Sequence, residues 1–196
     1  MPPSKPASKS TDLRVGRPTR QQILAAVDKT VPDVIAPNLR VLFCGINPGL
    51  YTAAVGHHFA RPGNRFWPAL YAAGFTARLV SPFEERELLT RGYGITNLVS
   101  RATASAGVLN KEELVRGRAR LTAKVRRYRP DFLAVLGLGA YRSAFKKPKS
   151  VVGQQPERIE ETILWVLPNP SGLNANYQRE DLVRLFRELK TALDGG

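Results

Sequence analysis

Three short, mostly apolar segments constrain the fold of this chain more than any other feature. They read "RVLFCGI" at 40–46, "FLAVLG" at 132–137 and "ILWVLP" at 163–168, and none of them alternates apolar with polar residues. Runs of this length and kind are typical of strands in a parallel sheet that helices cover on both faces. Helical patterns lie between them, so we predict an α/β fold, a three-layer α/β/α sandwich with a largely parallel central sheet.

The predicted helices differ in the strength of their signals. The clearest follows Asn110, because Glu113 stands at the third helical position, as in a capping box, and Pro130 ends the pattern. Further helices are predicted at 21–31, 65–74, 81–92, up to Phe145 after the second strand, and at 178–193. We interpret 47–64 as a long loop, 94–99 as a short apolar element and 146–156 as a basic loop.

The length of 196 residues favours a single domain, which we assign to residues 21–196. Residues 1–20 are rich in Pro, Ser and basic residues and are predicted to be a disordered basic tail. The lone cysteine, Cys44, excludes a disulfide framework and is expected to be buried in the core. No apolar run could span a bilayer and no signal peptide is recognisable, so we expect a cytoplasmic protein without membrane contact. If the protein is bacterial, we expect it to be associated with the nucleoid. We also expect it to be a monomer.

Basic residues dominate the charge, with a net charge of +14 and a pI near 10.5. Asp and Glu are absent from 34–83, from 88–111 and from 162–179. A surface built from these segments would attract phosphate, with Arg61, Arg65 and Arg101 as contacts to a nucleic-acid backbone. The alternative is a solvated basic surface without a specific partner.

Two loops stand out because each follows a predicted strand with an asparagine and a proline. The first is Asn47-Pro48-Gly49 and the second is Asn169-Pro170-Ser171-Gly172. Each alone could be a simple turn. Because ligands bind beyond the carboxyl ends of parallel strands, the two loops together predict one crevice.

The residue types in these loops limit the chemistry. Rigid turns can aim peptide N–H groups at a developing anion, and the Asn47 carboxamide can hold a water molecule. A carboxamide cannot take a proton as a carboxylate does, so the bond cleaved must have a good leaving group. Tyr51 and Phe59 could stack on a flat ring, although Phe59 could instead anchor the loop. The adjacent His57 and His58 are poor metal ligands without a third partner.

Both loops resemble the active-site motifs of a known family. "GINPGLYTAAVGHHFARPGNRFW" at 45–67 and "LPNPSGLN" at 167–174 are similar to the motifs of mismatch-specific uracil-DNA glycosylases, which are relatives of the thymine-DNA glycosylases. The likeness includes "AGFT" at 73–76 and "GITNLV" at 94–99 and continues into the final helix. It implies a monofunctional enzyme that flips mispaired uracil from double-stranded DNA containing U·G mismatches and hydrolyses the N-glycosidic bond, with no metal or cofactor.

The resemblance also implies residue roles. Asn47 matches the catalytic asparagine that positions water. Base binding would involve Ile46, Phe59, Thr52, Tyr51 and Asn169. Gly172 and Leu173 match the wedge that fills the gap in the duplex, and DNA-backbone contacts would come from Arg61, Arg65, Ser171 and Arg101.

Departures from the family pattern leave the substrate range open. Asn174-Ala175 stands where many members have Ser-Arg, and Asn97 replaces a lysine. Two other functions stay open from the residues alone: a non-catalytic module that senses mismatches, and a hydrolase of small nucleosides. Thymine, ethenocytosine, hypoxanthine and single-stranded uracil are all open as further substrates.

Overall fold

A five-stranded sheet forms the centre of the part of the chain that the structure describes. The computed structural model describes residues 16–172 and 174–195. The strands are β1 (Val41–Gly45), β2 (Tyr93–Asn97), β3 (Phe132–Leu136), β4 (Gly153–Ile159) and β5 (Thr162–Leu167). Their order is β2-β1-β3-β5-β4, and only the edge strand β4 runs antiparallel to its neighbour. The predicted α/β class with a largely parallel sheet is therefore confirmed.

Apolar side chains project from both faces of the sheet, which explains why the central strands do not alternate apolar with polar residues. In β1, Val41 and Phe43 join one core cluster, whereas Leu42 and Cys44 join the other. The same division holds for β3 and β5, because successive strand residues point to opposite faces. Cys44 is fully buried, as predicted.

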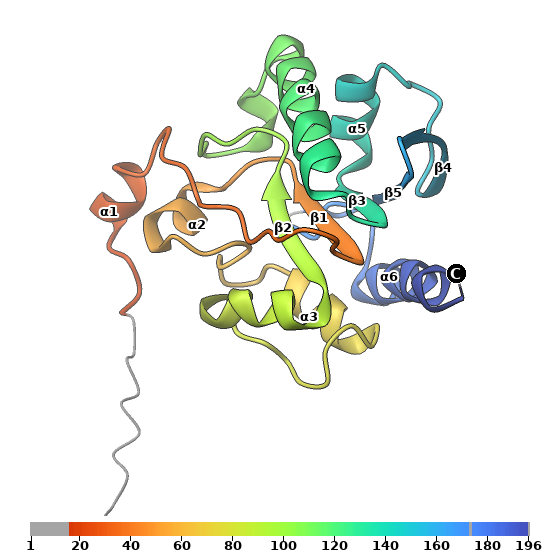
Figure 1. Ribbon diagram of the computed structural model, residues 1–196. Coiled ribbons are helices and arrows are strands. Elements are labelled where there is room, and N and C mark those ends of the chain that lie inside the picture. The colour runs from red at the N-terminus through yellow and green to blue at the C-terminus, as the bar shows by residue number, and fades with distance from the viewer. Residues whose placement is uncertain (1–15, 173, 196) are drawn as a thin grey trace, which may run out of the picture.

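Helices cover each face (Figure 1). On one face lie α4 (Lys111–Tyr128) and α5 (Leu138–Phe145), and on the other lie α3 (Phe66–Ala72) and α6 (Arg179–Asp194). The Asn110–Glu113 capping box of α4 is present as predicted, with Glu113 N–H donating to Asn110 Oδ1 at 2.8 Å. Together with the sheet, these helices make the predicted three layers.

Several elements differ from the sequence prediction. The interval 47–64 contains α2 (Leu50–Val55), which ends at Gly56 in a left-handed conformation. The interval 146–156 overlaps β4, whose mixed polar sequence "GQQPERI" suits an edge strand with one solvated face. The helix predicted at 21–31 is only α1 (Arg20–Leu24), and the helix at 81–92 is a 3₁₀ helix, η1 (Pro82–Arg91). A second 3₁₀ turn, η2 (Ala106–Val108), precedes α4.

The parallel strands end at one edge of the sheet, and this edge collects the loops of interest. Each parallel strand has one residue of interest at or just beyond its carboxyl end: Asn97 for β2, Asn47 for β1, Gly137 for β3 and Asn169 for β5. The pairing extends past β1, because Leu98 N–H donates to the Gly45 carbonyl and Val99 N–H donates to the Ile46 carbonyl, both at 2.9 Å. The predicted crevice therefore has a defined position in the fold.

Candidate active site

A cavity of about 870 Å³ opens at the carboxyl edge of the sheet. It is lined from both Asn-Pro loops, from the end of β2 and from the start of α5. The lining includes Ile46, Asn47, Thr52, His58, Phe59, Arg61, Asn97, Thr103, Arg142, Asn169 and Ser171. None of the described lining residues is Asp or Glu, so the crevice carries no carboxylate there. Its volume falls in the usual range for ligand sites.

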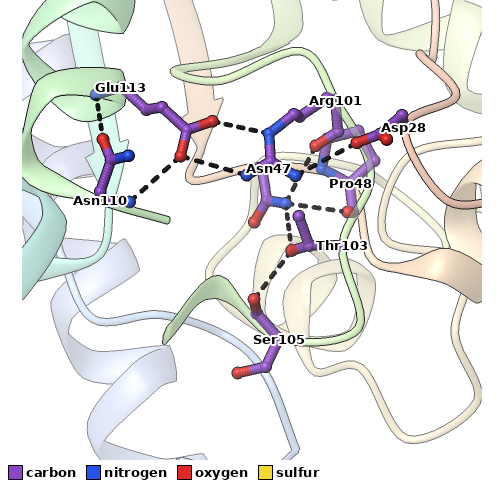
Figure 2. A network of polar contacts seen from close by, with 8 residues as sticks. All are labelled: Asp28, Asn47, Pro48, Arg101, Thr103, Ser105, Asn110 and Glu113. Carbon is purple, nitrogen blue, oxygen red and sulfur yellow. Dashed lines mark hydrogen bonds and ion pairs between the residues drawn. The ribbon is translucent and has the colours of Figure 1, made fainter. Parts of the chain in front are cut away.

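The carboxamide of Asn47 is held in one orientation. Its Nδ2 donates to the carbonyls of Pro48 at 3.2 Å and Arg101 at 3.1 Å, and to Thr103 Oγ1 at 2.7 Å (Figure 2). Carbonyl oxygens only accept hydrogen bonds, so the NH2 group must face them. Oδ1 therefore faces away from these partners and is free to accept a hydrogen bond from a water molecule in the cavity.

A second layer of contacts holds Arg101, whose carbonyl supports Asn47. The Arg101 guanidinium donates to Glu113 at 2.6 and 3.1 Å and to Asp28 at 3.2 Å (Figure 2). The Arg101 guanidinium, with help from the Asn110 N–H, lowers the pKa of Glu113 to about 2. Thr103 Oγ1 in turn donates to the Ser105 carbonyl at 2.8 Å. The first turn of α4 thus fixes the segment against which Asn47 rests.

Arg65 joins the start of α3 to the second Asn-Pro loop and the residues that follow it. Its guanidinium donates to the carbonyls of Ser171 at 2.6 Å, Tyr177 at 2.7 Å and Asn174 at 3.0 Å. Its backbone N–H also donates to the Pro170 carbonyl at 2.9 Å. Arg65 was predicted to contact DNA, and the structure instead places its guanidinium inside the protein as a brace for the second loop.

The second loop is also stabilised by its own side chains. Asn169 Oδ1 accepts from Ser171 N–H at 3.0 Å, which makes a local turn. Asn174 Nδ2 donates to the Asn169 carbonyl at 3.0 Å, so this departure from the family pattern has a structural role. A Cβ added to Gly172 would lie 2.6 Å from the Gly63 carbonyl oxygen, so this position has no room for a side chain.

Phe59 forms one wall of the cavity. Its ring stacks on Phe66 with centroids 4.1 Å apart, and its backbone has a φ of 54°, a region that few bulky residues adopt. Gly45 lies beneath it, since a Cβ there would be 3.3 Å from Phe59 Cζ and 2.6 Å from Asn97 Oδ1. The glycine lets an aromatic ring and a carboxamide approach the strand end together.

His58 and Asn97 meet behind this wall. His58 is buried, and burial lowers the pKa of its imidazole, which favours the neutral ring. Its Nε2 lies 3.0 Å from the Pro32 carbonyl and must donate to it, so Nδ1 is the acceptor for the Asn97 amide at 3.4 Å. Neither histidine belongs to a metal cluster, because the described residues contain no group of three His, Cys, Asp or Glu side chains placed to hold an ion.

The remaining predicted site residues divide into three groups. Thr52 and the exposed Arg61 line the cavity. Tyr51 and Arg101 do not: Tyr51 precedes Thr52 by one residue on α2 and so points about 100° away from it, and Arg101 is engaged by Glu113 and Asp28. Leu173, like residues 1–15 of the predicted tail, lies outside the described residues.

Sequence reasoning missed two residues that support the site. Thr103 contacts Asn47 across 56 positions of sequence, and Glu85 contacts His57 and His58 from η1. No local pattern marks either residue, because both contacts depend on tertiary structure. Thr103 does lie in a segment without acidic residues, which is the one signal that could have drawn attention to it.

Fold and site together define an α/β protein whose crevice lies at the carboxyl edge of its sheet and is lined by carboxamides and arginines, with no carboxylate among the described lining residues. The family model of the uracil DNA glycosylase superfamily matches residues 32–190, and the chain belongs to this superfamily. The solution NMR structure of a candidate uracil DNA glycosylase from Methanosarcina acetivorans is similar in fold, with a TM-score of 0.56 and 16% sequence identity. That match covers 84% of this chain and 99% of the other.

Proposed function

We propose that this member of the uracil DNA glycosylase superfamily is a mismatch-specific, monofunctional DNA glycosylase. It takes uracil opposite guanine out of double-stranded DNA and hydrolyses the N-glycosidic bond, which leaves an abasic site. Its chemistry needs no metal or cofactor in this scheme. A mispaired base leaves the stack at a lower cost than a paired one, so part of the selectivity arises before the bond is cleaved.

The observation that carries the proposal is the orientation of Asn47. Three acceptors hold its NH2 group, and Oδ1 is left to accept from a water molecule in the cavity. A carboxamide can orient this water but cannot remove its proton in the ground state. Water attack on the sugar carbon therefore follows advanced loss of the base, and the proton leaves once the new C–O bond has formed.

The crevice suits a leaving group that departs as an anion. Uracil carries the electron pair of the broken bond away, delocalised over two carbonyl groups. The described lining residues include no carboxylate that would repel it, and hydrogen-bond donors of the lining would stabilise its charge. The phosphates of the DNA help to stabilise the cationic sugar.

Base recognition is assigned to the wall formed by Phe59 and its neighbours. The Phe59 ring offers a flat surface for stacking, with Thr52 and Ile46 on the same side of the cavity. Asn97 and Asn169 offer amide groups to the edges of the base or to the sugar. The predicted wedge begins at Gly172, which directly follows the cavity-lining Ser171 and packs too closely against Gly63 to carry a side chain.

The proposal takes its phosphate contacts from residues that line the cavity. Arg61 is exposed at the cavity and forms no ion pair with a described residue, so it is the preferred cation. Ser171, which lines the cavity, is proposed as a second contact to the DNA backbone. Arg65 and Arg101 are removed from the set because their guanidinium groups are occupied within the protein.

The test is excision from labelled oligonucleotides. A duplex with one U·G pair is incubated with excess enzyme and treated with alkali, and breakage at the uracil is expected. Parallel duplexes with U·A and T·G pairs, a uracil single strand and free deoxyuridine measure the preference. No breakage at U·G contradicts glycosylase activity, equal rates on U·G and U·A contradict mismatch specificity, and equal turnover of deoxyuridine favours a nucleoside hydrolase.

A further inference from the structure

Glu85 is a buried carboxylate that belongs to neither Asn-Pro loop and does not line the cavity. It lies on η1, where it is 5% exposed, although Glu84 and Glu87 on the same helix form surface ion pairs with Arg78. Burial of a carboxylate is costly unless hydrogen bonds compensate for the lost water. The partners of Glu85 therefore identify what it does.

Both oxygens of Glu85 contact the turn that leads into Phe59. Oε1 lies 3.0 Å from His57 Nδ1, and Oε2 accepts from the His58 backbone N–H at 2.7 Å. The His57 ring also packs edge-on against Phe83 of η1, with centroids 5.0 Å apart. One side chain thus attaches two consecutive residues of the turn to η1.

The turn is held from its other side as well. The Trp67 indole N–H donates to the His58 carbonyl at 3.2 Å, and the His58 imidazole donates to the Pro32 carbonyl at 3.0 Å. His58 is therefore fixed through its N–H, its carbonyl and its ring. Glu85 supplies the contact to the N–H, which no other hydrogen bond among the described residues replaces.

Phe59 follows directly and has a backbone conformation that bulky residues rarely adopt. A residue with a φ of 54° keeps that conformation only when its surroundings determine it. Its ring must also stay stacked on Phe66 while it forms the wall of the cavity. Trp67 holds the peptide group directly before Phe59 through the His58 carbonyl, and Glu85 holds the peptide group before that one through the His58 N–H, so the two side chains together restrict the backbone that enters Phe59.

We propose that Glu85 is a positioning residue that holds Phe59 in its left-handed conformation and so sets the wall against which the base stacks. This inference rests on the proposed function, because it assigns Phe59 to the base. Glu85 itself touches neither water nor base, and it acts through His57, His58 and Phe59. Without it, the turn can relax to an ordinary backbone conformation and the ring leaves the cavity wall.

The test is a double-mutant cycle in single-turnover excision from a U·G duplex at saturating enzyme. Glu85→Ala is expected to lower the rate about 10-fold, an effect of the size assigned to one lost positioning contact. In a Phe59→Ala background the same substitution is expected to have less than a twofold further effect, because the ring through which it acts is gone. Glu85→Gln is expected to stay within about threefold of wild type, since its amide can still accept from the His58 N–H.

Controls separate this role from a general loss of stability. Glu87→Ala, an exposed glutamate on the same helix, should leave the rate unchanged. If Glu85→Ala does not fold, His57→Ala is the substitute, because it removes one of the two contacts of Glu85. We expect it to lower the excision rate about threefold, and to have no further effect in the Phe59→Ala background. The inference would be overturned, with the glycosylase activity intact, by an unchanged excision rate for Glu85→Ala. It would also be overturned if the rate of the double variant fell by the product of the two single-variant effects. A wild-type enzyme that releases no uracil would overturn the proposed function and the inference with it.

Discussion

A single neutral side chain, Asn47, determines the chemistry that the crevice can support. Its amide hydrogens are directed to oxygens of the 101–103 segment and of Pro48, so only its oxygen remains for a ligand. An unpaired Asn carboxamide could rotate and present either end to the cavity. The fixed orientation therefore presents Oδ1 to the cavity, and a carboxamide oxygen can accept a hydrogen bond from water without taking its proton.

Substitution of Asn47 tests this role directly. Asn47→Ala is expected to lower the single-turnover rate on a U·G duplex by about 10²-fold or more, because one preorganised polar group is lost. Binding of the same duplex should change by less than about threefold. Rates at saturating enzyme, together with a fluorescence-anisotropy titration, measure the two effects. An unchanged rate would remove Asn47 from the mechanism.

Thr103 is expected to act through Asn47. Thr103→Val keeps the volume of the buried side chain but removes the oxygen that accepts from Nδ2 at 2.7 Å. We expect about a 10-fold lower excision rate, because the carboxamide can then rotate. Thr103→Ser keeps the hydroxyl and should restore the rate to within about twofold. Equal rates for the valine and serine variants would contradict the contact.

At the scale of elements, the site is assembled by contacts between loops that leave neighbouring strands. Arg65 attaches the loop after β5 to the start of α3, and Arg101 attaches the segment after β2 to the first turn of α4. These two guanidinium groups were expected to bind phosphate, and the structure uses them to hold loops together. Arginine suits this role because its planar fork can donate several hydrogen bonds in fixed directions.

The brace made by Arg65 predicts a loss of stability. Arg65→Ala leaves three carbonyl groups of the second loop without their donor, and the free energy of unfolding is expected to fall by about 2–3 kcal/mol. Arg61→Ala, at an exposed position in the segment between α2 and α3, should change it by less than about 0.5 kcal/mol. Urea denaturation of both variants measures the loss in free energy of unfolding. Equal losses for Arg65→Ala and Arg61→Ala would contradict the stabilising role of Arg65.

The ion pair at the start of α4 predicts a dependence of stability on pH. The Arg101 guanidinium lowers the pKa of Glu113 from 4.5 to about 2, so the pair stabilises the folded state above pH 4.5 and loses this effect as the pH falls through 2. Glu113→Gln removes the charge and keeps the capping box. The urea midpoint of this variant should lie below that of wild type at pH 6, and the gap should close between pH 4.5 and pH 2.

The matched control for this experiment is Glu112→Gln. Glu112 is exposed in the same first turn and forms no ion pair with any described residue. At pH 6, Glu112→Gln should shift the urea midpoint less than Glu113→Gln does. At pH 2, the two substitutions should shift it by similar amounts. A gap for Glu113→Gln that stays constant with pH would show that the charge of Glu113 does not contribute.

Across the whole molecule, a net charge of +14 favours association with a polyanion. Positive charge is spread over the surface, but the described cavity lining contains arginines and no carboxylates. Among the described residues, no helix combines the length and apolar character needed to cross a membrane. Under the proposed function, we expect the net charge to provide long-range attraction and the arginines at the cavity to set the position of the bound duplex.

The salt dependence of binding tests this division. The logarithm of the association constant for a duplex should fall linearly with the logarithm of salt concentration, and Arg61→Gln should reduce the magnitude of that slope by about 0.9, the effect of one lost phosphate contact. Arg184→Gln on α6, where Glu188 already pairs with the arginine, should leave the slope unchanged. Anisotropy titrations at several salt concentrations measure both. Equal slopes for Arg61→Gln and wild type would remove Arg61 from the interface.

Elements with strong local signals were predictable from the sequence, and elements without them were not. The apolar runs of β1, β3 and β5 and the capping box at Asn110 follow from residue type and spacing alone. By contrast, the polar edge strand β4 has no apolar run, and the six-residue helix α2 has no side-chain cap. Short elements with weak intrinsic propensity form only where tertiary packing supports them.

The sequence by itself determined the sheet, its two buried faces and the presence of two Asn-Pro loops at strand ends. These follow from the apolar character of short segments and from turn residues, which are patterns within short stretches of the chain. Only the tertiary structure decided which oxygen atoms orient Asn47, which carbonyl and carboxylate groups Arg65 and Arg101 bind, and that Glu85 holds the residue before Phe59. Each of these depends on hydrogen bonds between segments far apart in sequence, whose partners are fixed only when the strands align.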